Sequence, residues 1–236
     1  MKLKFVISVL LAMFAFSCSD DDGNSYKCSD CVSVPEANAA YDNTGQGIYK
    51  GVVIGSSGTI KFDIANSDNT LTAVLIIDGQ EVLLTATGSY SPTTGFSGAF
   101  TGTLNGQDAS IVFTVSTAGG FQLITVNIPG HPDIMFTVMK ERSTQLVEAF
   151  EGTYQGQATG TFNLLVLRDE DDNGEWYAIS RSTELDGYYE GTIDDDDLVG
   201  LGGSIIVVGE IEGHSVKGSW ENTTGGTGTW TGKRTL

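Results

Sequence analysis

Short runs of β-branched and aromatic residues, separated by Gly, Asn and Asp, follow one another from Ile48 to the C-terminus. Such runs are typical of β-strands, and residues that accept a positive φ are typical of the tight turns between them. Four dipeptides are suited to two-residue hairpins: Asp78-Gly79, Asn105-Gly106, Gly119-Gly120 and Asn173-Gly174. This pattern predicts an all-β fold in which sequential strands pair antiparallel as a meander.

The runs form two series that look like copies of one another. The first predicts strands near 47–54, 58–66, 70–78, 80–90, 95–104, 108–117, 121–128 and 133–140. The second predicts strands near 152–158, 160–168, 174–183, 186–193, 198–208, 210–220 and 227–234. A repeat of about 100 residues is long enough to be a β-domain in itself. We therefore expect tandem antiparallel units over 46–142 and 151–236, each a small barrel or a sandwich.

One short helix is expected between the two units, over residues 143–150. Ser143 or Thr144 can cap its first turn, and Leu146, Val147 and Phe150 would share one helical face. The segment is read as a connector packed against the sheets.

Each series begins with Gly-x-Tyr, at Tyr49 and Tyr154, and ends on basic residues, Lys140 and Arg142 or Lys233 and Arg234. This arrangement resembles the lipocalin and avidin group of up-and-down barrels, in which a first-strand Trp stacks on a last-strand Arg or Lys. Here Tyr stands where that group has Trp. The resemblance implies small closed barrels of about eight strands.

The N-terminus has the layout of an export signal. Lys2 and Lys4 precede an apolar run from Phe5 to Phe16 that is interrupted only by Ser8. A membrane-spanning helix needs roughly 20 apolar residues, so this run is too short to be one.

The segment Ala15-Phe16-Ser17-Cys18 resembles the lipobox of bacterial lipoproteins, although that family has Leu where Ala15 stands and a smaller residue at Phe16. The resemblance implies that residues 1–17 are removed and that Cys18 carries the lipid of an outer-membrane anchor. Ser19-Asp20-Asp21-Asp22 also resembles the surface-export signal of such lipoproteins. The alternatives are an ordinary secreted protein with a later cut, and a charged tether facing the periplasm.

Residues 18–45 are polar, contain Pro35 and show no apolar period, which predicts a flexible linker. Within it, Cys28 and Cys31 are expected to form a local disulfide in an oxidising compartment. A redox pair would need a βαβ setting, and a metal site would need two further Cys or His ligands nearby.

The chain is strongly acidic, with a net charge of −18 that becomes −20 once Lys2 and Lys4 are lost with the signal. This balance excludes nucleic acid as a partner, because phosphate binding needs clustered Lys and Arg. Cations are the natural small partners.

The sequence from Asp169 resembles the first half of a calcium-binding loop, with Asp169, Asp171 and Asn173 at the first, third and fifth positions before Gly174. The twelfth position is Ser180 rather than Glu, and the same residues suit a hairpin turn without a metal. The acidic run 194–197 is a second, weaker candidate.

Aromatic residues of the second series are candidates for binding a carbohydrate or a small apolar ligand: Trp176, Tyr188, Trp220 and Trp230. Core packing is the alternative for most of them. Side chains alternate along a strand, so one residue of Trp176-Tyr177 and one of Tyr188-Tyr189 should face inward.

The residue types favour binding over catalysis. His131 and His214 are the two histidines, and there is no Gly-x-Ser-x-Gly elbow before a helix. Acidic pairs that would suit a surface glycan hydrolase can be drawn from Glu175, Glu184, Glu190, Glu210 and Glu212. We expect a cell-surface lipoprotein that acts as a non-catalytic binding or structural module. The alternatives are a lipocalin-like carrier, which requires a cavity, and the hydrolase, which requires close acidic pairs in a cleft.

Overall fold

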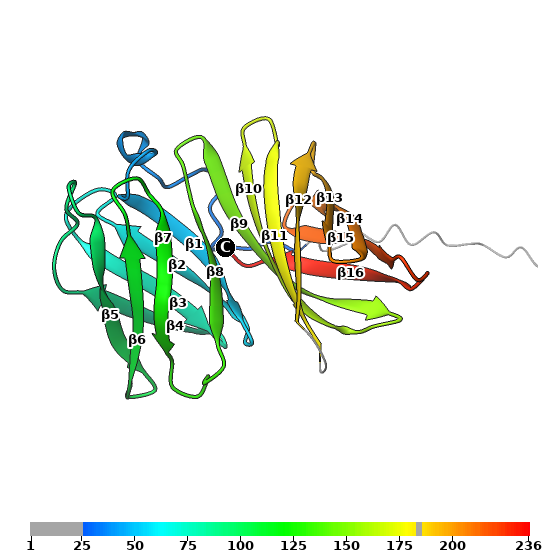
Figure 1. The fold of residues 1–236 in the computed structure, drawn as a ribbon, viewed down its shortest axis with the longest axis horizontal. Helices are drawn as coiled ribbons and strands as arrows, with labels where there is room; N and C mark the ends of the chain where they lie inside the picture. Colours follow the sequence, from blue (N-terminus) through cyan, green and yellow to red (C-terminus); the bar gives the residue numbers. More distant parts are fainter. Residues whose placement is uncertain (1–25, 183–185) are drawn as a thin grey trace, which may run out of the picture.

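The structure, a computed structural model, describes residues 26–182 and 186–236. These residues form a 3₁₀ turn (Ala39–Tyr41) and two antiparallel β-units, which confirms the all-β meander. Figure 1 shows the units side by side, with the C-terminus between them. Cys18 and the proposed signal lie outside the described residues, among which no helix is long and apolar enough to cross a membrane.

The first unit, β1–β8, is an open eight-stranded sheet with the order β7-β6-β5-β4-β3-β2-β1-β8. Its strands are β1 (Gly47–Ile54), β2 (Gly58–Ile64), β3 (Leu71–Ile77), β4 (Gln80–Ala86), β5 (Phe96–Leu104), β6 (Gln107–Val115), β7 (Phe121–Asn127) and β8 (Met135–Lys140). The first seven strands form a meander. The eighth strand, β8, then pairs with β1, so that the sheet curls towards closure but has two ends, β7 and β8.

Aromatic rings fill the interior of the first unit and contact one another. Phe113 stacks on Phe62 with ring centroids 4.3 Å apart, and it meets Tyr49 edge-on at 5.5 Å. Phe100 lies edge-on to Phe62 at 5.2 Å. All four side chains are fully buried. Inward side chains alternate with partly exposed ones along β3, as expected for a sheet with one face on the core.

The second unit, β9–β16, is a closed barrel. Its strands are β9 (Gln145–Gly156), β10 (Gly160–Asp169), β11 (Gly174–Arg181), β12 (Asp186–Asp194), β13 (Asp197–Gly202), β14 (Ile205–Glu212), β15 (Ser215–Asn222) and β16 (Thr227–Arg234). The stretch expected as strands 198–208 and 210–220 is three strands instead of two. Its turns are at Gly203 and Gly213, whose φ values are +59° and +60°. The first turn lies at Gly202-Gly203, a hairpin signal that the two-strand interpretation missed, and the second offers only Gly213, a weaker signal than Asn-Gly.

The predicted connector helix over 143–150 is wrong, because the chain there runs into β9. Residues 146–150 are buried on both faces of this strand. Phe150 faces the barrel core, while Val147 and Ala149 pack against Val52 of β1. A strand that is buried on both faces lacks the alternation of apolar and polar residues that identifies a half-exposed strand. Its apolar residues can then have the spacing expected for one face of a helix.

Two glutamates join the units in addition to this apolar contact. Glu141 is fully buried, and its Oε2 lies 2.6 Å from Lys50 Nζ and accepts a 3.1 Å hydrogen bond from Val147 N. Glu151 of β9 accepts hydrogen bonds from Ser57 Oγ (2.7 Å) and Gly58 N (2.5 Å) of the first unit. Loss of Glu141 would remove two contacts at once, because Lys50 would keep only its 3.1 Å ion pair with Glu36 and Val147 N would lose its acceptor.

The predicted flexible linker is docked on both units from Tyr26 onward. Tyr26 Oη donates to the Arg234 carbonyl at 2.8 Å, on the second unit. Further along, Glu36 N donates to Glu141 Oε1 at 2.6 Å, and Asn38 N donates to Asn66 Oδ1 at 2.8 Å, on the first unit. We call residues 26–46 the N-terminal strap, because they are fixed by specific polar contacts despite their linker-like composition.

Candidate ligand-binding cavity

A cavity of about 490 Å³ lies inside the second barrel. Six aromatic side chains contribute to its wall: Tyr154, Phe162, Trp176, Tyr189, Trp220 and Trp230. Ligand pockets of drug-sized molecules span roughly 300–1,000 Å³ and are mostly apolar. The size and the lining of this cavity therefore fit a small organic molecule.

The cavity exists because its largest rings lie along the barrel wall against glycines. Trp176 pairs across strands with Gly191, which pairs with Gly200 on the next strand. A β-carbon added at Gly191 would lie 2.7 Å from Trp176 Cε2, and one at Gly200 would overlap the same indole. The indole thus extends over two neighbouring strands, in space that only glycine leaves free.

The same arrangement recurs around the barrel. Trp230 extends over Gly218 and Gly209, and Phe162 extends over Gly152 and Gly232. Rings that lie along the wall do not fill the barrel axis. The centre of the barrel is therefore left open.

Hydrogen bonds fix two of the three indoles. Trp176 Nε1 donates to Thr192 O at 3.1 Å, and Trp230 Nε1 donates to Ser219 O at 3.2 Å. Trp220 Nε1 is buried against Gly228 and finds no acceptor among the described residues. Packing alone holds Trp220 in place.

The mouth of the cavity is polar. Gln157 and Ser182 follow β9 and β11, and Asn222 and Thr224 lie at the β15–β16 turn, so all four belong to the same end of the meander. Asn222 Oδ1 accepts from Thr224 N and Gly226 N at 3.0 and 2.8 Å, which orders this turn. A ligand would meet hydroxyl and amide groups at the rim and aromatic rings inside.

The opposite end is closed by ionic contacts. Fully buried Glu148 lies 2.5 Å from Arg168 Nε and 2.8 Å from Arg234 Nη1. Arg168 Nη1 also contacts Asp172 and Asp196 at 3.0 and 2.6 Å. Burial would lower the pKa of Arg168, but Glu148 and the two aspartates outweigh burial and raise it above its ordinary value. This end is therefore a charged base in which Glu148 forms ion pairs with two arginines.

The acidic loops predicted as calcium sites meet at this base. Asp169 Oδ1 accepts from Asp171 N (3.1 Å) and Asn173 N (3.0 Å), so it orders a hairpin turn, and Asp172 supplies the positive φ of +56°. The turns after Asp169 and Asp194 send Asp172 and Asp196 to the same guanidinium. The Arg168 guanidinium balances the charge of these two carboxylates.

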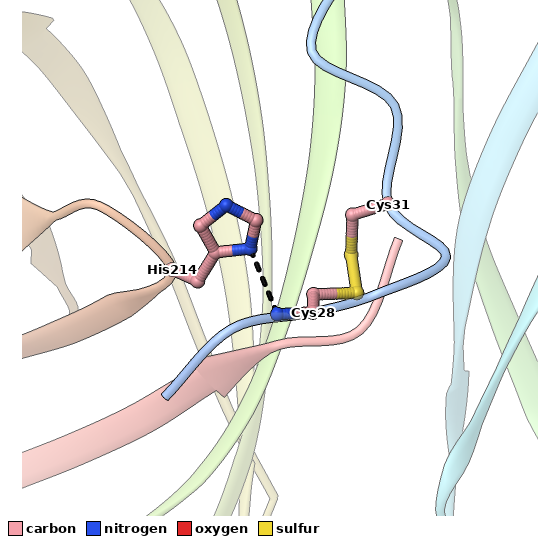
Figure 2. A group of neighbouring side chains, drawn as sticks. All are labelled: Cys28, Cys31 and His214. Atoms are coloured by element: carbon pink, nitrogen blue, oxygen red, sulfur yellow. Dashed lines mark hydrogen bonds between the residues drawn. A yellow bond between two sulfur atoms is a disulfide. The ribbon is translucent and has the colours of Figure 1, made fainter. Parts of the chain in front are cut away.

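The N-terminal strap packs on the outside of the base through the predicted cysteine pair. The structure has the Cys28–Cys31 disulfide, and Cys28 N donates to His214 Nδ1 at 3.0 Å (Figure 2). Arg234 Nη2 donates to Val32 O at 2.5 Å. His214 adds a third potential ligand to the two sulfurs, which sequence spacing did not reveal, but the sulfurs are joined in the disulfide.

The four aromatic residues predicted as ligand contacts divide between the two faces of the barrel. Trp176, Trp220 and Trp230 line the cavity, whereas Tyr188 lies on the outer wall with 62% of its surface exposed. In each of the adjacent pairs Trp176-Tyr177 and Tyr188-Tyr189, one side chain faces inward, as alternation along a strand predicts. The inward residues are Trp176 and Tyr189. Exposed apolar side chains accompany Tyr188 on the outer wall: Val199, Leu201, Ile206 and Val208.

Tyr154, Phe162 and Tyr189 also line the cavity but were not among the four predicted ligand contacts. The tyrosines of the lipocalin-type pattern differ between the units. In the first unit, Lys140 Nζ lies 5.8 Å from the centre of the Tyr49 ring. In the second, Tyr154 pairs across strands with Trp230, while Lys233 Nζ lies over Tyr26 of the strap at 5.0 Å.

The described carboxylates considered for a hydrolase do not line the cavity. Glu210 and Glu212 both contact Lys217 Nζ, at 3.1 and 2.6 Å, and Glu175 accepts from Tyr177 Oη at 3.3 Å. Glu190 is exposed, and Glu184 lies outside the described residues. Of the described residues that line the cavity, none is acidic.

Comparisons with protein-family models, with characterised proteins and with solved structures found no match to this chain.

Proposed function

We propose that the protein is a lipid-anchored, non-catalytic binding module whose second barrel holds a small, largely apolar ligand. The observation that carries this proposal is the aromatic-lined cavity of about 490 Å³ with its polar mouth and closed base. The resemblance to the lipocalin and avidin group supports it, since an eight-stranded barrel has an interior just wide enough for one small ligand.

Ligand contact would use the inward rings, chiefly Trp176, Trp220 and Trp230, which bury large apolar area with little loss of side-chain freedom. The first unit would serve as a support, because it fixes β9 through the Lys50–Glu141 pair and the apolar contact at Val147 and Ala149. The binding role thus belongs to the second unit.

The anchor part of the proposal rests on the lipobox-like sequence around Cys18 and on the acidic run that follows it. We propose attachment at the outer membrane with the body exposed at the cell surface. Protease treatment of intact cells tests this, with wild type and Cys18→Ala compared. Loss of wild type from intact cells and release of the variant from membranes are expected. A wild-type protein that is membrane-bound but protected would place the body in the periplasm.

The binding part is tested by native mass spectrometry of the protein isolated from membranes. Wild type and Tyr188→Ala, which changes only the outer wall, should retain a small-molecule adduct. Ala178→Phe should lose it, because Ala178 lines the cavity and the larger side chain would occupy its centre. Equal adducts in all three proteins, or no adduct and no uptake of any apolar probe, would contradict a binding role for the cavity.

A further inference from the structure

The described residues that line the cavity carry no formal charge. We propose that the cavity selects an uncharged ligand with a flat ring system, and that it rejects anions such as fatty acids. This inference rests on the proposed binding function and gives its ligand class.

The first argument is electrostatic. A carboxylate or sulfonate taken from water into an apolar cavity is strongly penalised unless a cation pairs with it. In the second unit, Arg168 and Arg234 are paired with Glu148 at the base, and Arg181 is paired with Asp186 at 3.1 Å.

The other two basic residues of the second unit are also engaged outside the cavity. Lys217 contacts Glu210 and Glu212, and Lys233 lies over the Tyr26 ring. None of these five cations lines the cavity, and the chain has a net charge of −18, which repels anions at a distance. The surroundings therefore oppose an anionic ligand inside and outside the barrel.

The second argument concerns shape. Trp176, Trp230 and Phe162 lie along the wall, so their rings line the open axis. Phe162 also meets Trp230 edge-on at 5.4 Å, which fixes the two planes relative to each other. Flat rings gain offset or edge-on aromatic contacts there. A flexible chain would lose more torsional freedom on confinement than a rigid ring system does.

The third argument concerns the mouth. Gln157, Asn222 and Thr224 supply amide and hydroxyl groups, which hydrogen-bond neutral polar substituents without supplying charge. A ring system with one or two hydroxyl or carbonyl groups at one end matches this distribution.

Two fluorescent probes test the inference, because they share one ring system and differ in charge: uncharged N-phenyl-1-naphthylamine and anionic 8-anilinonaphthalene-1-sulfonate. Both would be titrated into the mature chain carrying Cys18→Ser, so that no lipid competes for the cavity. Leu201→Ser, on the outer wall, corrects for binding to exposed apolar side chains. We expect the uncharged probe to bind at least about tenfold more tightly.

Two variants test where the probe binds and what determines the preference for an uncharged probe. Ala178→Phe should abolish saturable binding of the uncharged probe. Gln157→Lys places a cation at the mouth and should shift the preference towards the sulfonate by about tenfold relative to the uncharged probe.

The outcomes separate the ligand class from the function. If the sulfonate binds wild type as tightly as the uncharged probe, and Ala178→Phe abolishes both, the cavity binds ligands but the inferred class is wrong. If neither probe binds saturably, or Ala178→Phe has no effect, the cavity is not a binding site and both proposals fail.

Discussion

The two units share one strand plan but have opposite interiors. In the first unit, Phe62, Phe100 and Phe113 meet across the interior and contact one another. In the second, Trp176 and Trp230 lie along the wall over glycines of neighbouring strands. Ring position, and not ring content, therefore decides whether the interior of each β-unit is filled or hollow. Glycines opposite the rings create the space.

The largest effect expected from this comparison is on stability. Phe113→Ala removes a fully buried ring that contacts Tyr49, Phe62 and Phe100, and should cost about 3–5 kcal/mol of unfolding free energy. Trp220→Ala, at the cavity, should cost less because Trp220 is only partly buried and forms no hydrogen bond. Probe binding should show the reverse order, with affinity lost in Trp220→Ala alone.

Urea unfolding can follow the two units separately. All three tryptophans lie in the second unit and report its unfolding by fluorescence, whereas circular dichroism reports both units. Equal stability losses in Phe113→Ala and Trp220→Ala would contradict the difference between the two interiors.

A small-to-large pair gives the next largest effect. Ala73 is fully buried in the first core, and Ala178 lines the cavity of the second. Ala73→Leu should cost about 1–3 kcal/mol by overpacking. Ala178→Leu should stay within about 1 kcal/mol of wild type, because the cavity has room for the added carbons. Thermal unfolding of both variants measures this, and a similar loss in both would show that the second barrel is packed.

The strap extends the comparison, since one half contacts each unit. Cys28→Ser combined with Cys31→Ser should release only the half of the strap that contacts the second unit. The effect should be local, because a disulfide that closes so short a loop contributes at most about 2 kcal/mol. Limited proteolysis should cut near residue 30 faster in this variant, with the unfolding of both units unchanged. A weakened second barrel would instead assign the disulfide a role in the core fold.

The smallest effect concerns pH and the half of the strap on the first unit. Burial would raise the pKa of Glu36, but ion pairs with Lys61 and Lys50 outweigh burial and hold it below the ordinary value of 4.5. A lowered pKa in the folded state stabilises docking above the ordinary value, and this stabilisation is lost as the pH falls through the folded-state pKa. The contribution should be below about 1 kcal/mol, because Glu36 is partly exposed.

Hydrogen-exchange protection of the Asn38 amide measures this effect. Protection should fall in wild type as the pH drops below the ordinary pKa of 4.5, and it should change less in Glu36→Gln, which has no charge to lose. Identical pH profiles in the two proteins would exclude Glu36 as the titrating group.

Much of the fold followed from the sequence, because turn residues and strand residues alternate along it. The Asp78-Gly79 and Asn105-Gly106 turns adopt the positive φ values that their composition predicted. Strand β9 was mistaken for a helix because it is buried on both faces. The β13–β15 segment was read as two strands because its turns, at Gly202-Gly203 and Gly213, lie within otherwise continuous β-rich sequence.

The cavity was less accessible to sequence reasoning. Alternation placed Trp176 and Tyr189 inside, but the glycines that make room for the rings lie on other strands. Gly191 and Gly200 become partners of Trp176 only once the strand register is known. The contact of His214 with Cys28 likewise joins residues 186 positions apart. Spacing along the chain does not encode such pairs.

A crystal structure of the mature protein under xenon pressure tests the hollow second barrel most directly, because xenon enters apolar cavities and is visible as strong density. We predict xenon between Trp176, Trp220 and Trp230, and none among Phe62, Phe100 and Phe113. Rings turned inward to fill the barrel axis, with no xenon in the second unit, would contradict the account.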